Sequence, residues 1–132
     1  MAQPTLPVDP VRHGGASLRA FINIAELWRL SDEEQMRILG IDELAILQAW
    51  KFCVRAHETA AISEDMIVRI GCVLSIYASL VTLVSHERSA DWIRAPNKGS
   101  IFCGNSALAM MTSGALEDLD SVALYLLGQI HG

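Results

Sequence analysis

The spacing of apolar residues along the chain predicts an all-α protein. Apolar residues recur every three or four positions through most of the sequence, which is the period of an amphipathic helix. No segment alternates apolar and polar residues convincingly in the way that a strand does. We expect about six or seven helices. The first is expected over residues 18–29, with one apolar stripe of Leu18, Phe21, Ile24, Ala25 and Trp28.

Capping residues mark the helix boundaries that follow. Ser31 and Glu34 fit a capping box, in which each side chain accepts a hydrogen bond from the backbone N–H of the other residue. Gly40 is expected to end this second helix as a left-handed residue, and Asp42 to cap a third helix that includes Trp50. Two helices joined by a short glycine-containing turn have the outline of a helix-turn-helix.

Residues 63–84 form a long apolar segment, and we expect them to be the central helix, capped by Ser63. A membrane span needs about 20 predominantly apolar residues, but Arg69 interrupts this run and small or polar residues are spread through it. We therefore interpret it as a core helix and expect no membrane partner. Its additional apolar face needs cover, and a homodimer through this helix is one way to provide it.

The last third of the chain, residues 90–132, is expected to contain three further helices. The helix around Trp92 should end before Pro96 and Asn97, because proline disfavours helical geometry in the preceding residue. Ser106 can cap a short helix that Gly114 would end as a left-handed residue. A final helix carries Leu119, Val122, Leu126 and Ile130 at helical spacing.

This last third resembles the toxin-binding domain of the Xre/MbcA/ParS antitoxin family. The resemblance is carried, in order, by Trp92, Pro96, Asn97, Phe102, Gly104, Ser106, Ala107, Leu108, Gly114, Tyr125 and Leu126. The family more often has proline at the position of Ala107, but alanine is a good helix former. The stretch IAELWRLSDEEQMRILGI (24–41) resembles the Xre-like N-terminal region of the same family.

The resemblance implies a domain division and a function. Residues 1–17 would be a flexible N-terminal arm, residues 18–62 a degenerate helix-turn-helix part, and residues 63–132 the central helix with the toxin-binding domain. The chain would be the antitoxin of a type II toxin–antitoxin pair. Its partner would be a RES-domain toxin that uses NAD, either by degrading it or by ADP-ribosylating a protein. The antitoxin would inhibit the toxin by covering its NAD pocket.

The resemblance also indicates which residues would contact the toxin. Asn97, Lys98, Tyr125 and the tail from Gln129 to Gly132 are the expected contacts, whereas Trp92 and Leu108 would support the core. The complete set of expected toxin-binding residues is Pro96, Asn97, Lys98, Phe102, Tyr125, Gln129, Ile130, His131 and Gly132.

The distribution of charge fits a basic partner site. The formal net charge is −5, and no Lys or Arg follows Lys98. Glu117, Asp118 and Asp120 remain in this segment, and complementary charge speeds association and selects partners. A flexible tail, residues 130–132, could enter such a pocket as a plug. The alternative is that the chain ends in a frayed, exposed helix.

The third helix leaves open an alternative function, that of a DNA-binding transcriptional repressor of its own operon. A recognition helix offers Arg, Lys, Asn or Gln to bases and phosphates. This helix opens with Asp42 and Glu43, which would repel phosphates, and its candidate DNA contacts are Gln48, Lys51 and Arg55. It is either a scaffold that has lost its DNA contacts or a weak reader of bases.

The sequence contains no catalytic motif, so we expect neither an enzyme nor a bound cofactor or metal. The four histidines are scattered, and HExxH, GxSxG and P-loop patterns are absent. Cys103 is interpreted as a plain loop cysteine. The acidic residues 117–120 are interpreted as a helix N-terminus favoured by the helix dipole. Three cysteines without a CxxC pair suit reduced thiols in the cytoplasm. The N-terminal residues lack the features of a signal peptide; they could order on a partner or fray.

Overall fold

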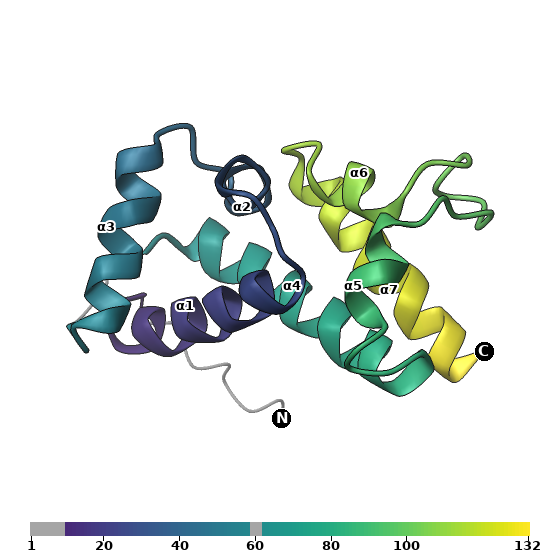
Figure 1. The fold of residues 1–132 in the computed structure, drawn as a ribbon, viewed down its shortest axis with the longest axis horizontal. Coiled ribbons are helices and arrows are strands. Elements are labelled where there is room, and N and C mark those ends of the chain that lie inside the picture. Colours follow the sequence, from purple (N-terminus) through teal and green to yellow (C-terminus); the bar gives the residue numbers. More distant parts are fainter. Residues whose placement is uncertain (1–9, 59–61) are drawn as a thin grey trace, which may run out of the picture.

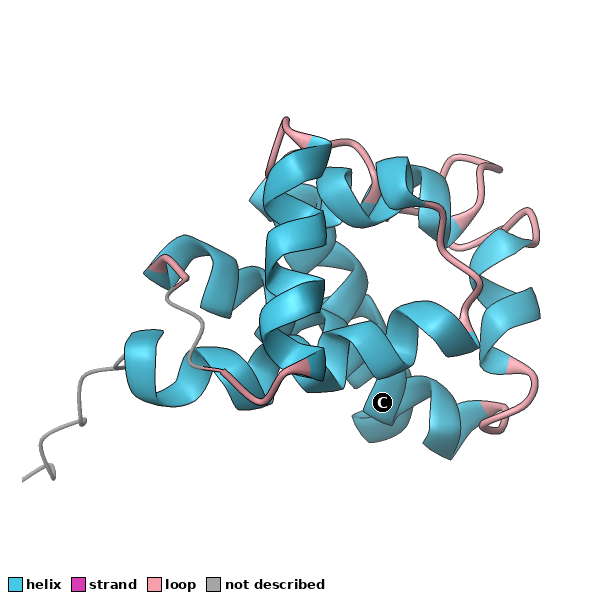
Figure 2. Cartoon of the chain, turned by 60° about the vertical axis from the view of Figure 1, so that its left-hand side comes forward, coloured by secondary structure: helices cyan, strands magenta, loops and turns pink. Residues whose placement is uncertain are grey.

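The structure, a computed structural model, describes residues 10–58 and 62–132, and side chains from Gly15 onward. Seven helices lie in these residues: α1 (Pro10–Leu27), α2 (Asp32–Leu39), α3 (Leu44–Arg55), α4 (Glu64–Leu83), α5 (Ser89–Arg94), α6 (Ala107–Met111) and α7 (Leu116–His131). Figures 1 and 2 show helices joined by loops. Within the described residues, the β-type pairing is one isolated antiparallel bridge between Pro96 and Ser106. The predicted all-α fold is confirmed.

The central position of α4 is also as predicted. In Figure 1 it passes from the N-terminal group of α1, α2 and α3 to the C-terminal group of α5, α6 and α7. Its closest packing partners are α7 and α1. Although α4 is long and apolar enough to cross a membrane by length and composition alone, one face is buried in the core of the protein. That face consists of Met66, Ile70, Val73, Ile76 and Leu80.

Local capping begins most of the helices where the sequence predicts. The Ser31–Glu34 capping box is formed, with bonds of 2.8 Å and 3.1 Å. Gly40 follows α2 with a left-handed φ of 73°, and Ser63 accepts a bond from the backbone N–H of Met66. These caps satisfy backbone groups that have no partner within the helix.

Three helix ends differ from the predictions. α3 is preceded by Glu43 rather than capped by Asp42, because Glu43 is the residue with extended backbone next to the helix. α6 follows its Ser106 cap but ends at Met111, with Thr112 as the C-cap, before the left-handed Gly114 is reached. α1 begins at Pro10, so residues 10–17, expected in a flexible arm, are helical. Proline suits the first helical position, because its φ is preset and its missing N–H would have no helical partner. Residues 1–9 of the expected arm lie outside the described residues.

Polar contacts join the end of α1 to α5. The Trp28 indole N–H donates to Ser89 Oγ at 3.0 Å in the protein interior. The Arg94 guanidinium donates to the backbone oxygens of Trp28 and Arg29 at 2.6 Å and 2.8 Å. Carbonyls at the C-terminal end of a helix have no partner within the helix. Arg94 therefore completes the end of α1 and fixes it beside α5.

Candidate functional site

The loop between α5 and α6 is held closed at its base. Pro96 and Ser106 form the antiparallel bridge, and the backbone N–H of Asn97 donates to the carbonyl oxygen of Asn105 at 3.0 Å. Within the loop, the side chain of Asn97 accepts a bond from the N–H of Gly99 at 2.8 Å. Residues 96–106, which we call the C-terminal loop, therefore have a defined backbone conformation.

Three aromatic rings connect this loop to α5 and α7. Phe102 lies between Trp92 and Tyr125, with ring centroids 6.2 Å and 5.1 Å away and ring planes nearly perpendicular. This edge-to-face geometry is favourable because the positive edge of one ring meets the negative face of the next. Phe102 is only 3% exposed. Phe102 therefore supports the loop from the core, although the resemblance placed it among the toxin contacts.

Gly99 and Tyr125 come into direct contact. A Cβ atom added to Gly99 would lie 2.7 Å from the hydroxyl oxygen of Tyr125, which is too close for any real side chain. The Tyr125 ring is partly buried. The loop and the middle of α7 therefore form one surface, in which Asn97 and Tyr125 are near neighbours through Gly99.

The remaining expected contacts lie along this surface and at the end of α7. Pro96, Lys98, Gln129, His131 and Gly132 are exposed, whereas Asn97, Tyr125 and Ile130 are partly buried. The flexible tail expected at residues 130–132 is not present as such. α7 continues through His131, and the N–H of Gly132 bonds to the carbonyl oxygen of Gly128 at 2.7 Å. The backbone bonds of the last turn hold these residues in the helix, so the end of the surface is a helix end.

Sequence reasoning missed two exposed apolar residues on α7. Leu124 is 59% exposed and Leu127 is 37% exposed. Their exposure could have been predicted from helical spacing, because both positions fall outside the buried stripe of Leu119, Val122 and Leu126. A shallow hollow of about 290 Å³ beside the C-terminal loop was not predicted either. Its lining includes the exposed Cys103, which has a left-handed φ of 51°.

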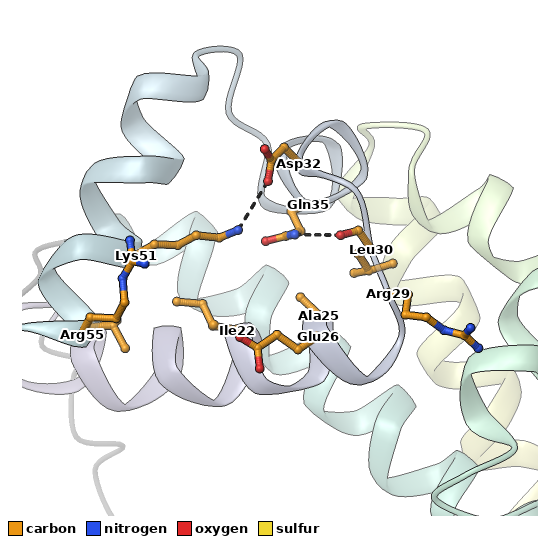
Figure 3. Close-up of a pocket in the computed structure, with 10 residues that line it drawn as sticks. Ile22, Ala25, Glu26, Arg29, Leu30, Asp32, Gln35, Lys51 and Arg55 are labelled. Carbon is orange, nitrogen blue, oxygen red and sulfur yellow. Dashed lines mark hydrogen bonds and ion pairs between the residues drawn. The ribbon is translucent and has the colours of Figure 1, made fainter.

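The three expected DNA-contact residues are not gathered on one outer face of α3. Figure 3 shows Lys51 and Arg55 among the residues that line a pocket of about 400 Å³ between α1, α2 and α3. The Lys51 ammonium lies 3.4 Å from a carboxylate oxygen of Asp32, and only 27% of the lysine side chain is exposed. Gln48 is exposed on the outside. Lys51 is therefore partly neutralised before any phosphate could approach.

The same pocket contains an amide oxygen without a protein partner. The Gln35 side chain is 5% exposed, and its Nε2 donates to the carbonyl oxygen of Leu30 at 2.9 Å. Its Oε1 accepts no hydrogen bond from the described residues. The basic residues of the lining are balanced in part by Glu26 and Asp32, so the pocket does not present a strongly basic surface to nucleic acid.

The side chains of the described residues do not assemble a metal site. No group of three His, Cys, Asp or Glu side chains among them could hold a metal ion. Cys72 on α4 lies 3.9 Å from a carboxylate oxygen of Asp120 on α7. Burial raises the pKa of the Cys72 thiol, and the negative charge of Asp120 raises it further. This thiol is therefore kept protonated, which is the opposite of an activated nucleophile.

The architecture defines an all-α protein whose N-terminal part is a helix-turn-helix. Residues 7–49 match the family described as the antitoxin Xre-like helix-turn-helix domain. The chain is 38% identical over 118 residues to the uncharacterized protein y4oB of Sinorhizobium fredii (strain NBRC 101917 / NGR234). That alignment covers 89% of this chain and 86% of the relative. The chain belongs to the same family as y4oB, and its N-terminal domain is of the Xre antitoxin type. No solved structure is significantly similar to the chain.

Proposed function

We propose that this chain is the antitoxin of a type II toxin–antitoxin pair and that it inhibits a RES-domain toxin that uses NAD. The match of residues 7–49 to the antitoxin Xre-like domain carries the proposal. The order of Trp92, Pro96, Phe102, Gly114 and Tyr125 along the chain supports the assignment of the toxin class. The proposed partner is therefore a protein, and the proposed location of the pair is the cytoplasm.

The surface formed by the C-terminal loop and α7 is the part that we propose covers the NAD pocket of the toxin. Asn97, Lys98, Tyr125 and residues 129–132 would make the contacts. The negative end of the α7 dipole lies at Gln129–Gly132, where it favours cationic groups. Since a pocket for a dinucleotide needs positive charge around its phosphates, the partial negative charge of this helix end is complementary to it. The blocking element in this proposal is a rigid helix end.

The proposal is tested by purifying the chain together with the product of the adjacent gene. We expect a stable complex that consumes NAD slowly. Removal of residues 129–132 should restore NAD consumption while the complex still forms. As a matched control, Ser121→Ala changes the same helix without touching the proposed contacts and should leave inhibition intact. If no complex forms, the antitoxin proposal fails.

A second outcome of this experiment would redirect the site assignment. If inhibition survives removal of residues 129–132, blocking comes from the C-terminal loop. In that case Lys98→Ala, which removes one of the proposed loop contacts, should weaken inhibition. If both variants still inhibit the toxin, the proposed contact surface is wrong, although the pairing of antitoxin and toxin still holds.

Binding to DNA is a second candidate function, favoured by the helix-turn-helix match. The proposal is that the chain represses its own operon through α3. A gel-shift experiment with the upstream DNA should then show binding that Lys51→Ala and Arg55→Ala abolish. The ion pair between Lys51 and Asp32 argues for weak binding at most. Absence of a shift with the unmodified chain would remove this candidate.

A homodimer through α4 remains a separate prediction. Val68, Val81 and Leu83 are exposed apolar residues on that helix. Covering them would remove apolar surface from water, which favours association. Sedimentation velocity of Val68→Ser, which should show weaker self-association than the unmodified chain, tests this prediction.

A further inference from the structure

The pocket between α1, α2 and α3 contains a buried hydrogen-bond acceptor that no described residue satisfies. Gln35 is 5% exposed, and its Nε2 donates to the carbonyl oxygen of Leu30 at 2.9 Å. That bond fixes the orientation of the amide, because the Leu30 oxygen requires the NH2 group as its donor. Oε1 accepts no hydrogen bond from the described residues. A buried acceptor without a partner is costly, so this atom indicates a ligand that donates to it.

A cation lies across the pocket from this acceptor. In Figure 3, the side chains of Gln35 and Lys51 point toward one another from α2 and α3. The Lys51 ammonium lies 3.4 Å from a carboxylate oxygen of Asp32, whereas a strong charge-assisted bond is about 2.7–2.9 Å long. An ammonium group has three N–H donors. Lys51 therefore retains donors for an anionic group of a ligand.

The floor of the pocket is apolar. Ile22 and Ala25 of α1 lie below the ends of Lys51 and Gln35 in Figure 3, and Val54 of α3 adds to the lining. The volume of about 400 Å³ lies within the range of about 300–1,000 Å³ that is usual for small-molecule sites. A single water molecule has a share of only about 30 Å³. The pocket is therefore large enough for an organic molecule with an apolar part.

We propose that this pocket binds a free amino acid with a large apolar side chain. The ammonium group of the ligand donates to Gln35 Oε1 and faces the carboxylate of Asp32. Its carboxylate accepts from the Lys51 ammonium, and its side chain lies against Ile22 and Ala25. This inference does not rest on the proposed toxin.

A zwitterion matches the lining better than a molecule with a single charge does. A simple organic anion would leave Gln35 Oε1 without a donor, and the carboxylates of Glu26 and Asp32 in the lining would repel it. A simple amine would satisfy Gln35 but would leave Lys51 without an anionic partner beyond Asp32. Only a ligand with both charges and an apolar body uses the amide, the ammonium, the carboxylates and the floor together.

The test is titration of the isotope-labelled full chain with L-phenylalanine, followed by nuclear magnetic resonance. We expect saturable shifts of the Gln35 side-chain NH2 signals and of the Lys51 backbone amide at millimolar ligand. Hydrocinnamate lacks the ammonium group, and L-phenylalaninamide lacks the free carboxylate, but both retain the aromatic ring. Each should bind more than about tenfold more weakly, because one polar group of the pocket is left unpaired.

Lys51→Met tests the contact with the carboxylate. It should weaken the binding of phenylalanine about tenfold, because it removes a bond between two charged groups. It should leave the binding of L-phenylalaninamide unchanged, since that ligand offers no carboxylate to Lys51. Arg37→Met is the matched control. Arg37 also pairs with a carboxylate on α2, that of Glu33, but does not line the pocket, so both affinities should stay the same.

Ile22→Trp tests the apolar floor while the polar groups stay in place. Ile22 is partly buried, and the larger ring should fill the space of the ligand and abolish binding. The spectrum of the variant shows directly whether it is folded. If it is not, the comparison of the two ligands in Lys51→Met decides the question.

Four results would overturn the proposal. Phenylalanine at millimolar concentration would shift no signal of the pocket. Hydrocinnamate would bind as tightly as phenylalanine, which would assign the pocket to a simple organic acid. L-Phenylalaninamide would bind as tightly, which would assign it to the N-terminal residue of a peptide. Finally, a folded Ile22→Trp variant would bind phenylalanine normally, which would place the ligand elsewhere on the chain.

Discussion

The Nη1 group of Arg69 donates to the backbone oxygen of Gly114 at 3.1 Å, across 45 positions of sequence. The same nitrogen donates to the backbone oxygen of Ile38 at 3.3 Å, and Nε bonds to Asp65 at 2.9 Å. A Cβ at Gly40 would lie 2.8 Å from Arg69 Cζ, so this glycine also leaves space for the guanidinium. One side chain on α4 thus links the end of α2 to the segment before α7.

Arg69→Ala should lower the free energy of unfolding by roughly 2–3 kcal/mol, because it removes charge-assisted bonds to two backbone oxygens. The Arg69 side chain is only 12% exposed, so water replaces these bonds poorly. Urea denaturation measures the effect. Arg37→Ala is the control, since Arg37 makes a similar i,i+4 ion pair with Glu33 but is 56% exposed. Arg37→Ala should lower the free energy of unfolding by less than about 0.5 kcal/mol. Equal effects would show that Arg69 is merely another surface arginine.

Alanine should have opposite effects at Gly99 and Gly128. Gly99→Ala forces a Cβ against the Tyr125 hydroxyl and should destabilise the protein by about 1–2 kcal/mol. Gly128 lies inside α7 with no atom within 4 Å of an added Cβ. Gly128→Ala should therefore stabilise the protein by about 0.5–1 kcal/mol. Thermal unfolding of both variants measures the difference.

A double variant identifies the cause at Gly99. Tyr125→Phe removes the hydroxyl oxygen. In that variant, Gly99→Ala should therefore lower the free energy of unfolding by less than it does in the unmodified chain. An unchanged cost would mean that the loop backbone, and not the contact with Tyr125, requires glycine.

Ser89→Ala should lower the free energy of unfolding by about 1–3 kcal/mol, because it leaves the buried indole N–H of Trp28 without its acceptor. Ser121→Ala is a useful comparison, since Ser121 Oγ bonds only within its own helix to the carbonyl oxygen of Glu117. That change should be nearly neutral. Denaturation monitored by tryptophan fluorescence should also report a changed environment of Trp28 in Ser89→Ala alone.

The Cys72 thiol should be the slowest of the thiols in the described residues to react with iodoacetamide, whereas the exposed Cys103 should react first. Burial and the carboxylate of Asp120 raise the pKa of Cys72, and the thiolate is the reactive form. Asp120→Asn removes the charge and should lower this pKa, so Cys72 labelling should become faster. Peptide mass spectrometry after timed labelling distinguishes the sites. An unchanged rate would exclude Asp120 as a cause.

The same raised pKa has a defined effect on stability. When the folded pKa exceeds the unfolded one, the stabilising contribution is present below the unfolded pKa and is lost as pH rises through the folded pKa. The free energy of unfolding should therefore fall in the alkaline range. Cys72→Ala should make that fall less steep, whereas Cys103→Ala should not. If the free energy of unfolding falls equally steeply with rising pH in the unmodified chain, Cys72→Ala and Cys103→Ala, Cys72 is not the cause of the fall.

The sequence identified the segment that contains the candidate site. It did not show which residues of that segment are exposed and which are buried. Asn97, Lys98 and Tyr125 were expected at the surface and are at least partly exposed, and Leu108 was expected in the core and is buried. Phe102 was expected at the surface but lies in the core. Whether an aromatic residue in a loop faces inward depends on which rings meet it, here Trp92 and Tyr125 from two different helices.

The sequence by itself determined the fold class and most helix boundaries, because caps and helical spacing act within a few residues. The Ser31–Glu34 box, Gly40 and Ser63 are examples. The pairing of Lys51 with Asp32, the contact of Gly99 with Tyr125 and the bonds of Arg69 were decided only by the tertiary structure. These contacts join residues that are distant in sequence, and only tertiary packing, which places α3 beside α2 and α4 beside α7, brings them within bonding distance. The pocket between α1, α2 and α3 follows from the same packing, since its lining comes from all three helices.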